Sequence, residues 1–330
     1  MKELPAIVAQ LHESSTFPAA LATLVHVSGS SYRRPGARLL LSCQGKKWGS
    51  ISGGCLEEDV LLHAQTVIQN GIPKTITYDT TEENDLVWGV GLGCHGVVQV
   101  FIERLEGLPD WAKAWRLHQA SREDTTLTIP YRSDRLDEQK TTRLPTALPP
   151  REGVFVQSIP PVLALTIFGA GDDAVPLARL AKELGWFVSV LDPRPAFATA
   201  DRFPSADVVR VQSTGLEPTS LVTGPHAAAV VMTHHYVHDL PLLRSLLPLP
   251  LFYLGLLGPK KRAEKLLDQI ASEPAGLPAE QRARLYGPVG LDLGGDSPES
   301  VALAILAEIQ SVYTGRDARP LRARARPIHQ

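Results

Sequence analysis

The sequence is poor in the residues that mark several protein classes. Only three cysteines, Cys43, Cys55 and Cys94, occur among its 330 residues, and an odd, small number argues against a disulfide framework. They form no C-x-x-C pair, which argues against a zinc site of that type. The formal net charge is −2, so nucleic acid is not expected as the main partner. No apolar run approaches the length that spans a bilayer.

The remaining composition, with 44% hydrophobic and 21% charged residues, is that of a globular protein. Its length favours two domains, each with its own core. The first fifteen residues, interrupted by Glu3, Gln10 and Glu13, predict a short amphipathic helix instead of a signal peptide. We therefore expect a cytoplasmic protein whose thiols stay reduced.

The first predicted domain, residues 1–105, alternates short apolar strands with glycine turns. Two strands flank the loop SGSSYRRPG, a helix follows Cys55 and ends near Gly71, and GVVQVFIERL is another strand. Residues 106–160 are predicted to be a connecting segment, partly ordered, with a short helix around Trp111–His118.

Strands and helices alternate in the second predicted domain, residues 161–315. PVLALTIF, WFVSVLD, AAAVVMT and PLFYLG are the expected strands, and VPLARLAKELG and ESVALAILAEIQSVY the clearest helices. Ser297 and Pro298 provide a cap and a first-turn residue for the last helix. The fold class is therefore α/β: a mixed α/β domain followed by a Rossmann-like doubly wound parallel sheet. Residues 316–330 form a basic tail, expected to be flexible or to dock on an acidic surface.

A dinucleotide-type turn joins the first strand and helix of this second domain. Gly169-x-Gly171-x-x-Ala174 matches the G-x-G-x-x-G/A pattern, and Asp192 ends the next strand, where an acidic residue holds a ribose hydroxyl. The neighbouring Asp172 and Asp173 would repel a pyrophosphate at the helix N-terminus. Both a nucleotide site and a Rossmann domain that has lost or altered its site stay open.

Two cysteines lie among clustered glycines, in GSISGGCLEED and GVGLGCHG. Cys55 precedes a predicted helix, a position that favours a reactive or metal-binding thiolate, and Gly53 and Gly54 let a ligand approach the backbone. Near Cys94, N–H groups between the glycines could bind an anion; the glycines are Gly89, Gly91, Gly93 and Gly96. The alternatives are two small core residues, or a zinc site of Cys55, Cys94 and His95. Cys43 is expected to be structural.

Two further groups follow expected strands of the second domain. His234, His235, His238 and Asp239 come after AAAVVMT, at the carboxyl end where open α/β sheets bind ligands. We keep His234 as a site residue, and expect His235 and His238 to be exposed and Asp239 to cap the next helix. Lys260 and Lys261, in GPKKR, either contact a phosphate or form a solvated basic turn.

Several of these segments together resemble the XdhC/CoxI family, accessory factors of xanthine dehydrogenase and carbon monoxide dehydrogenase. In the first domain they are GSSYRRPGARLLLS, GSISGGCLEEDV and GLGCHGVVQVFIERL; in the second, IFGAGDDAVPLARLAKELGW, DPRPAFATADRFPSAD, VVMTHHYVHDLPLLRSLL, YLGLLGPKKR and GPVGLDLGGDSPESVALAILAEI. They are co-linear, and only residues 106–160 match poorly. His95 stands where one common form of the motif has glycine.

The resemblance implies a chaperone of the molybdenum cofactor. Such a protein binds the cofactor, supports its sulfuration with a cysteine desulfurase, and delivers it to a molybdenum hydroxylase of the xanthine dehydrogenase type; a homodimer is plausible. It implies that thiolates of Cys55 and Cys94 engage the molybdenum or its labile sulfur. Glycine amides and Arg33, Arg34 and Arg38 would hold the phosphate and pterin, although an RRPG turn also occurs as a plain solvated turn.

Two enzyme classes remain as alternatives. An NAD(P)-dependent oxidoreductase explains Gly169, Gly171 and Asp192 directly but leaves both cysteine loops without a role. A zinc-dependent hydrolase needs a ligand set that the sequence does not supply. Neither a general-base pair nor a nucleophile triad is visible in the sequence, so we favour a binding and transfer protein over a turnover enzyme.

Overall fold

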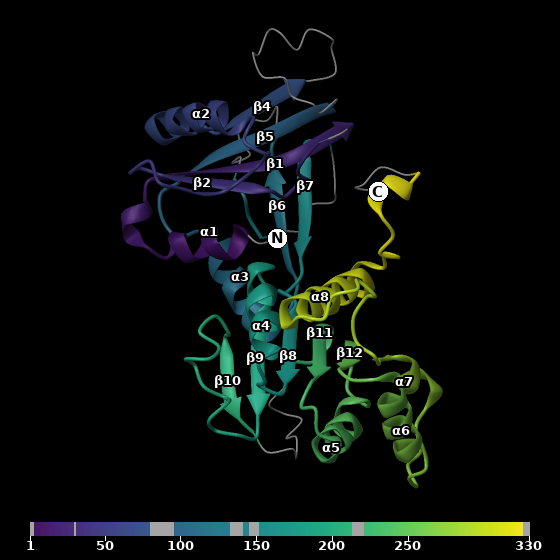
Figure 1. Cartoon of the computed structure of the whole chain (residues 1–330). Helices are drawn as coiled ribbons and strands as arrows, with labels where there is room; N and C mark the ends of the chain where they lie inside the picture. Colours follow the sequence, from purple (N-terminus) through teal and green to yellow (C-terminus); the bar gives the residue numbers. More distant parts are fainter. Residues whose placement is uncertain are drawn as a thin grey trace. The chain divides into compact units, whose positions relative to one another are not determined.

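The computed structural model describes residues 3–29, 31–79, 96–132, 141–144, 152–212 and 221–325. The chain divides into two compact units at Pro161 and Val162, apart from the last residues of the tail. No hydrophobic cluster among the described residues combines side chains of both units. Each unit therefore has a core of its own. Figure 1 labels the helices and strands of the chain.

The first unit is built on a five-stranded antiparallel sheet in the order β3-β2-β1-β5-β4. The long central strand β1 pairs with β2 along one edge and with β5 along the other, Leu21 facing Leu40 and Glu103. Its strands are β1 (Ala19–Gly29), β2 (Arg38–Ser42), β3 (Lys47–Gly49), β4 (Lys74–Asp79) and β5 (Gly96–Leu105).

Helices cover both faces of this sheet, because successive side chains of a strand point to opposite sides. Ala20, Ala22 and Leu24 of β1 pack under α2 (Glu57–Asn70). Ala19 and Leu21 face α1 (Glu3–Leu11) and α3 (Asp110–Ser121) on the other side. A short 3-10 turn, η1 (Ser14–Thr16), leads into β1. Figure 1 shows α2 and α1 on opposite sides of the sheet.

The segment after β5 also belongs to the first unit. It contains α3, at the place of the short helix expected from the sequence, and a two-stranded antiparallel sheet of β6 (Thr125–Pro130) and β7 (Val154–Ile159). Trp111 and Trp115 of α3 and Leu127 of β6 pack with α1 in one cluster. The described part of residues 106–160 is thus ordered and shares the first unit's core.

The second unit is a six-stranded parallel sheet in the order β10-β9-β8-β11-β12-β13. The order reverses between β8 and β11, as in doubly wound folds, so the predicted fold class is confirmed. Its strands are β8 (Ala164–Phe168), β9 (Phe187–Asp192), β10 (Val208–Val211), β11 (Gly224–Val231), β12 (Leu251–Leu256) and β13 (Leu285–Tyr286).

Two layers of helices enclose this parallel sheet. α4 (Ala174–Glu183) and α8 (Pro298–Thr314) pack on one face with Ala228 and Val230, and α5 (Tyr236–Leu246) and α6 (Lys260–Ala271) on the other with Ala229 and Val231. A five-residue helix, α7 (Ala279–Ala283), and a 3-10 turn, η3 (Leu321–Ala323), complete the unit.

The start of α8 agrees with the predicted cap. The Ser297 hydroxyl accepts a hydrogen bond from the Ser300 amide at 3.2 Å, and Pro298 occupies the first turn. Among the described helices none is long and apolar enough to cross a membrane.

Candidate functional site

The loop that carries Cys55 connects β3 to α2. Gly54 adopts φ +114°, a conformation that only glycine takes readily. The Cys55 side chain is half-buried and packs at the edge of the cluster beneath α2. Leu56 is the N-cap of that helix, so Cys55 stands immediately before the helix, as the sequence predicts.

The carboxylate of Glu57 accepts hydrogen bonds from several residues of this loop. Its Oε1 accepts hydrogen bonds from the Ser50 hydroxyl at 2.7 Å and from the amides of Ile51 and Ser52 at 3.2 and 2.8 Å. Its Oε2 accepts from the Gly54 amide at 3.0 Å and from the Ser52 hydroxyl. Glu57 is only 8% exposed, so five hydrogen bonds inside the protein hold the segment before Cys55 in one conformation.

The protonation of Glu57 follows from these contacts. Burial raises the pKa of its carboxyl group, but the hydrogen bonds from Ser52, Ser50 and the backbone outweigh burial, and the pKa lies below its usual value. Sequence reasoning missed Glu57. The available signal was an acidic residue in the first helical turn directly after a Ser/Gly-rich loop, a position from which a carboxylate can accept backbone N–H bonds.

The three arginines that were assigned to ligand binding occupy different environments. Arg34 is exposed, and Arg33 is ion-paired with Glu3 of α1. Arg38 is fully buried, and its guanidinium donates to the Gly36 carbonyl at 2.9 Å and to Gln157 Oε1 at 2.8 Å. A ligand in solution can thus meet Arg34 directly but not Arg38.

Arg38 belongs to a buried polar network with Glu103 of β5. Burial lowers the pKa of Arg38 to about 10, while the negative charge of Glu103 raises it. Burial also raises the pKa of Glu103, against the hydrogen bonds that its carboxylate accepts from Thr141 and Thr142 and the charge of Arg38. These two charges compensate each other across the sheet of the first unit.

The second glycine–cysteine segment cannot be compared with the first. Cys94, Gly91, Gly93 and His95 lie outside the described residues. Within the described ranges no group of three His, Cys, Asp or Glu side chains is placed to hold a metal ion. Cys43 is exposed, with its Sγ 3.3 Å from the Phe17 carbonyl.

In the second unit, the predicted glycine turn connects β8 to α4. Gly169 has φ +112°, and a Cβ there would lie 2.5 Å from the carbonyl oxygen of Met232, so no larger residue fits. Gly171 has an ordinary φ, and a Cβ there would meet only the tip of the Asp173 side chain, at 2.8 Å. Ala174 is the first residue of α4 and is buried against the sheet.

Asp192, assigned to a ribose hydroxyl, is bound by the protein itself. It is 1% exposed. Its carboxylate accepts from the Ala170 amide at 2.7 Å, from the Arg194 amide at 2.8 Å and from the Arg194 guanidinium at 2.9 and 2.8 Å. Burial raises the pKa of Asp192, but the hydrogen bonds from Arg194 and Ala170 have the larger, opposite effect, and the pKa lies below its usual value.

Two carboxylates, each paired with a basic side chain, stand where a pyrophosphate would lie beside this turn. Asp172 pairs with Arg202 at 2.8 Å, and Asp173 pairs with Nε2 of His234 at 2.7 Å. His234 follows the end of β11, at the point where the strand order reverses, and has φ +61°, which is strained for a histidine. His234 thus lies at the carboxyl end of the sheet, the location that the sequence predicts.

The contacts of Asp172, Asp173 and Asp192 affect how a dinucleotide could bind at the turn between β8 and α4. A pyrophosphate at the start of α4 would meet Asp172 and Asp173, and a ribose would have to displace Arg194 from Asp192. Arg194 is also held over the Phe197 ring, with its guanidinium carbon 3.8 Å from the ring centroid. The turn thus has the backbone of a nucleotide site, while the Asp192 carboxylate already accepts four hydrogen bonds from the protein.

Asp239 corrects one expectation from the sequence. It does not cap α5: His235 is the N-cap, without a side-chain cap bond, and Asp239 lies inside the helix. Its buried carboxylate accepts from Thr233 Oγ1 at 2.5 Å and from Arg262 of α6. Because Arg262 is distant in sequence, its pairing with Asp239 could not be read from local capping patterns.

Other residues of these two groups lie nearer to solvent. His235 is exposed as expected, whereas His238 is half-buried. Lys260 and Lys261 are exposed at the start of α6.

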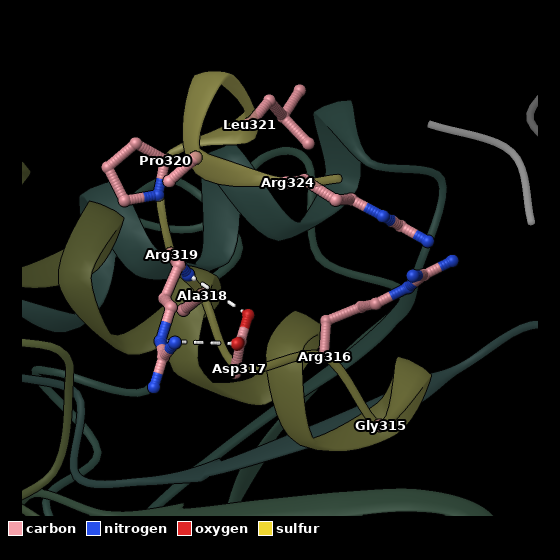
Figure 2. A pocket seen from close by; sticks show the side chains of 9 residues that line it. Gly315, Arg316, Asp317, Ala318, Arg319, Pro320, Leu321 and Arg324 are labelled. Atoms are coloured by element: carbon pink, nitrogen blue, oxygen red, sulfur yellow. Dashed lines mark hydrogen bonds and ion pairs between the residues drawn. The ribbon is translucent and has the colours of Figure 1, made fainter. Parts of the chain in front are cut away.

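The basic tail surrounds a pocket of its own. Residues 315–321, 323 and 324 line it, and Figure 2 shows Arg319 paired with Asp317, while Arg316 and Arg324 extend in a common direction. The pocket is formed by one continuous segment after α8 and contains none of the predicted site residues. Docking of this tail on an acidic partner stays a prediction.

Sequence comparison relates both units to one family. The profile described as the XdhC Rossmann domain matches residues 165–309, and the profile of the XdhC and CoxI family matches residues 14–79. A probable xanthine dehydrogenase subunit of Bacillus subtilis (strain 168) is 35% identical over 88% of this chain and 92% of its own length. The chain belongs to the XdhC and CoxI family.

Two further relatives are a protein with a named function and a protein with a solved structure. The molybdenum cofactor insertion chaperone PaoD of Escherichia coli (strain K12) is 26% identical over 89% of this chain and 83% of its own length. A crystal structure described as a xanthine dehydrogenase from Bacillus halodurans superposes with a TM-score of 0.81 at 29% identity, covering 97% of this chain and 98% of that one. The family and the fold predicted from the sequence are confirmed.

Proposed function

We propose that this protein is a maturation factor that binds the molybdenum cofactor, supports its sulfuration and delivers it to a molybdenum hydroxylase of the xanthine dehydrogenase type. Family membership supports an accessory role, since the relative PaoD is named as a cofactor insertion chaperone. The observation that carries the proposal is the Cys55 loop, in which a half-buried thiol follows two glycines and one carboxylate fixes the backbone.

The residues of this loop fit the chemistry of the cofactor. Apart from Gly54 itself and its two chain neighbours, no atom of the described residues lies within 4 Å of the position that a Cβ of Gly54 would take, so a ligand can reach the backbone there. A cysteine thiolate is a soft ligand suited to molybdenum or to its labile sulfur. Arg34 is exposed on the neighbouring loop and supplies a cation for a phosphate. The bound group would supply the redox chemistry of the client enzyme, and this chain would bind, orient and shield it.

The partners follow from the same proposal. They are a cysteine desulfurase as sulfur source, a molybdenum hydroxylase as recipient, and a second copy of this chain. The alternative function, an NAD(P)-dependent oxidoreductase, rests on the backbone of the Gly169 turn. It is less well supported, because the Asp192 carboxylate is bound by Arg194 and because the acidic side chains of Asp172 and Asp173 precede the first residue of α4.

The test compares cysteine variants of protein purified anaerobically from a molybdenum-replete host. The released material is oxidised and assayed for the fluorescent pterin derivative and for NAD(P). We expect near-stoichiometric pterin in the wild type and in Cys43→Ala, and its loss in Cys55→Ala and Cys94→Ala. Cys43→Ala is the matched control, because Cys43 is exposed and lies outside the glycine loops.

Two outcomes would count against the proposal. Wild-type protein that carries NAD(P) without pterin would shift the assignment to the oxidoreductase. Pterin retained in full by both Cys55→Ala and Cys94→Ala would show that these thiols do not hold the cofactor.

A further inference from the structure

An exposed aromatic side chain stands beside the Cys55 loop. Tyr32 lies between β1 and β2 and is 67% exposed. The base of its loop is fastened to the sheet, since the Gly36 amide donates to the Leu24 carbonyl at 2.7 Å and the Leu24 amide to the Ala37 carbonyl at 2.9 Å. Arg33, the next residue, is ion-paired with Glu3. The ring is thus presented to solvent from an anchored loop.

Gly53 lies against the ring of Tyr32. A Cβ at residue 53 would be 3.5, 3.6 and 3.7 Å from Cδ1, Cγ and Cδ2 of Tyr32. These nearly equal distances place that position over the face of the ring, at ordinary van der Waals separation. The Tyr32 ring and the Gly53 backbone therefore form two sides of one corner.

The fold itself does not require glycine at position 53. Its φ lies outside the left-handed range, and the added Cβ would make only ordinary contacts. Gly54 differs, because its φ of +114° does favour glycine. A glycine without a conformational or steric reason leaves room for another molecule to approach the backbone closely.

The corner is held in place by the same contacts that hold Cys55. The Glu57 carboxylate binds the amides of Ser52 and Gly54, on either side of Gly53. A ligand that enters the corner thus meets a backbone already ordered, two residues before Cys55 in the chain, and little conformational freedom is lost on binding.

We propose that Tyr32 and the Gly53–Gly54 backbone form a wall of the ligand site that takes a flat heterocyclic ring. The ring stacks on the face of Tyr32, with its edge against Gly53. Tyr32 is then a binding residue that selects planar aromatic ligands, because stacking on an aromatic side chain requires a π-face and tolerates variation at the ring edge. This inference rests on the proposed function, in which the flat ring is the pterin of the molybdenum cofactor.

The experiment measures binding of molybdopterin to purified apoprotein, full chain, under anaerobic conditions. Ultrafiltration separates free from bound ligand, and the bound fraction is quantified as the fluorescent oxidised derivative. We expect Tyr32→Ala to raise the Kd about tenfold or more, and Tyr32→Phe to stay close to wild type, because the phenyl ring keeps the stacking face. Gly53→Ala should also raise the Kd about tenfold, because its methyl group stands over the ring where the ligand edge comes to the backbone.

Gly107→Ala is the matched control for Gly53→Ala. Gly107 also has φ outside the left-handed range, and apart from Gly107 and its two chain neighbours no atom of the described residues lies within 4 Å of its Cβ position. The thermal midpoints of both variants should equal that of the wild type, so a binding loss in Gly53→Ala alone cannot come from unfolding.

The outcomes separate this inference from the proposed function. Wild-type protein that does not bind molybdopterin overturns both. Wild-type binding that is unchanged in Tyr32→Ala and Gly53→Ala overturns the aromatic wall and leaves the proposed function standing. Loss of binding in Tyr32→Phe as well as in Tyr32→Ala would also overturn it, since the hydroxyl and not the ring face would then be the contact.

Discussion

At the scale of single residues, arginines close together in the sequence have different roles. Arg38 is buried and faces the charge of Glu103, whereas Arg34 is exposed on the loop before it. Breaking a buried charge pair leaves the remaining charge uncompensated in a medium of low polarity. Arg38 is therefore best explained as part of the core, and of these two arginines only Arg34 is placed to contact a ligand.

We expect Arg38→Ala to lower the free energy of unfolding by about 3 kcal/mol, because Glu103 loses its counter-charge and the core loses a large side chain. Arg34→Ala should change it by no more than about 0.5 kcal/mol. Urea unfolding at pH 7 measures both. Equal stability of the two variants would show that the Arg38 guanidinium is not part of a buried network.

Glu57 gives a prediction with a defined pH dependence. Its pKa in the folded protein lies below the usual 4.5, so its ionised form stabilises the fold above about pH 4.5. That stabilisation is lost as pH falls through the lower, folded-state pKa. Glu57→Gln should be about 2 kcal/mol less stable than wild type at pH 7, and the difference should shrink as the pH falls below 4.5.

The control for this variant is Glu58→Gln. Glu58 is exposed and stands in the same first turn of α2, so its loss has a similar effect on the helix dipole. Urea midpoints at pH 7, 5, 4 and 3 provide the comparison. A stability difference between Glu57→Gln and wild type that does not depend on pH would contradict the assigned protonation.

At the scale of elements, the turn between β8 and α4 shows how one glycine is fixed by a neighbouring strand. Gly169 approaches the backbone of Met232, which follows β11, so its constraint comes from a segment more than sixty residues away in the chain. Gly171, two positions later, has no such neighbour. The backbone thus requires glycine at position 169, whereas at position 171 only a flexible side chain stands in the way of a larger residue.

Gly169→Ala should destabilise the second unit by about 2–4 kcal/mol, because the left-handed backbone is strained for alanine and the Cβ meets a carbonyl oxygen. Gly171→Ala should cost less than about 1 kcal/mol, since only a flexible carboxylate has to move. Thermal unfolding followed by far-UV circular dichroism compares them. A cost at Gly171 as large as at Gly169 would contradict this account.

At the scale of the whole molecule, the described core is divided in the same way as the chain. The clusters of the first unit contain side chains from Leu4 to Ile159, and those of the second start at Leu163. A hydrophobic core confined to one stretch of chain is the condition for that stretch to fold alone. The described residues of each unit meet it.

We therefore expect a chain of residues 162–330, expressed by itself, to fold cooperatively. Its urea transition should be sigmoidal, with an m-value about half that of a protein of this full length, because m scales with the surface exposed on unfolding. Residues 1–161 are the companion fragment. A gradual, non-cooperative loss of structure in the 162–330 fragment would show that its core depends on the first unit.

Much of the fold could be predicted from local patterns. Short apolar runs beside glycine turns indicated β1 and β2, similar apolar runs indicated the buried strands β8 and β11, and Ser297–Pro298 marked the start of α8. The co-linear motifs indicated the family. The two-stranded sheet of β6 and β7 was not predicted, because its strands are separated by more than twenty residues and one of them lies in a polar, proline-containing stretch.

The candidate site was only partly predictable. The sequence by itself determined which residues stand in glycine turns, before helices or at strand ends. It could do so because backbone propensity and periodicity act over a few positions. Tertiary structure alone decided that Arg38 is buried while Arg34 is exposed, that Asp192 is bound to Arg194 and Ala170, and that Asp239 pairs with Arg262. The physical reason is that the burial and partners of a polar side chain depend on which distant segments pack around it, and no local pattern encodes that.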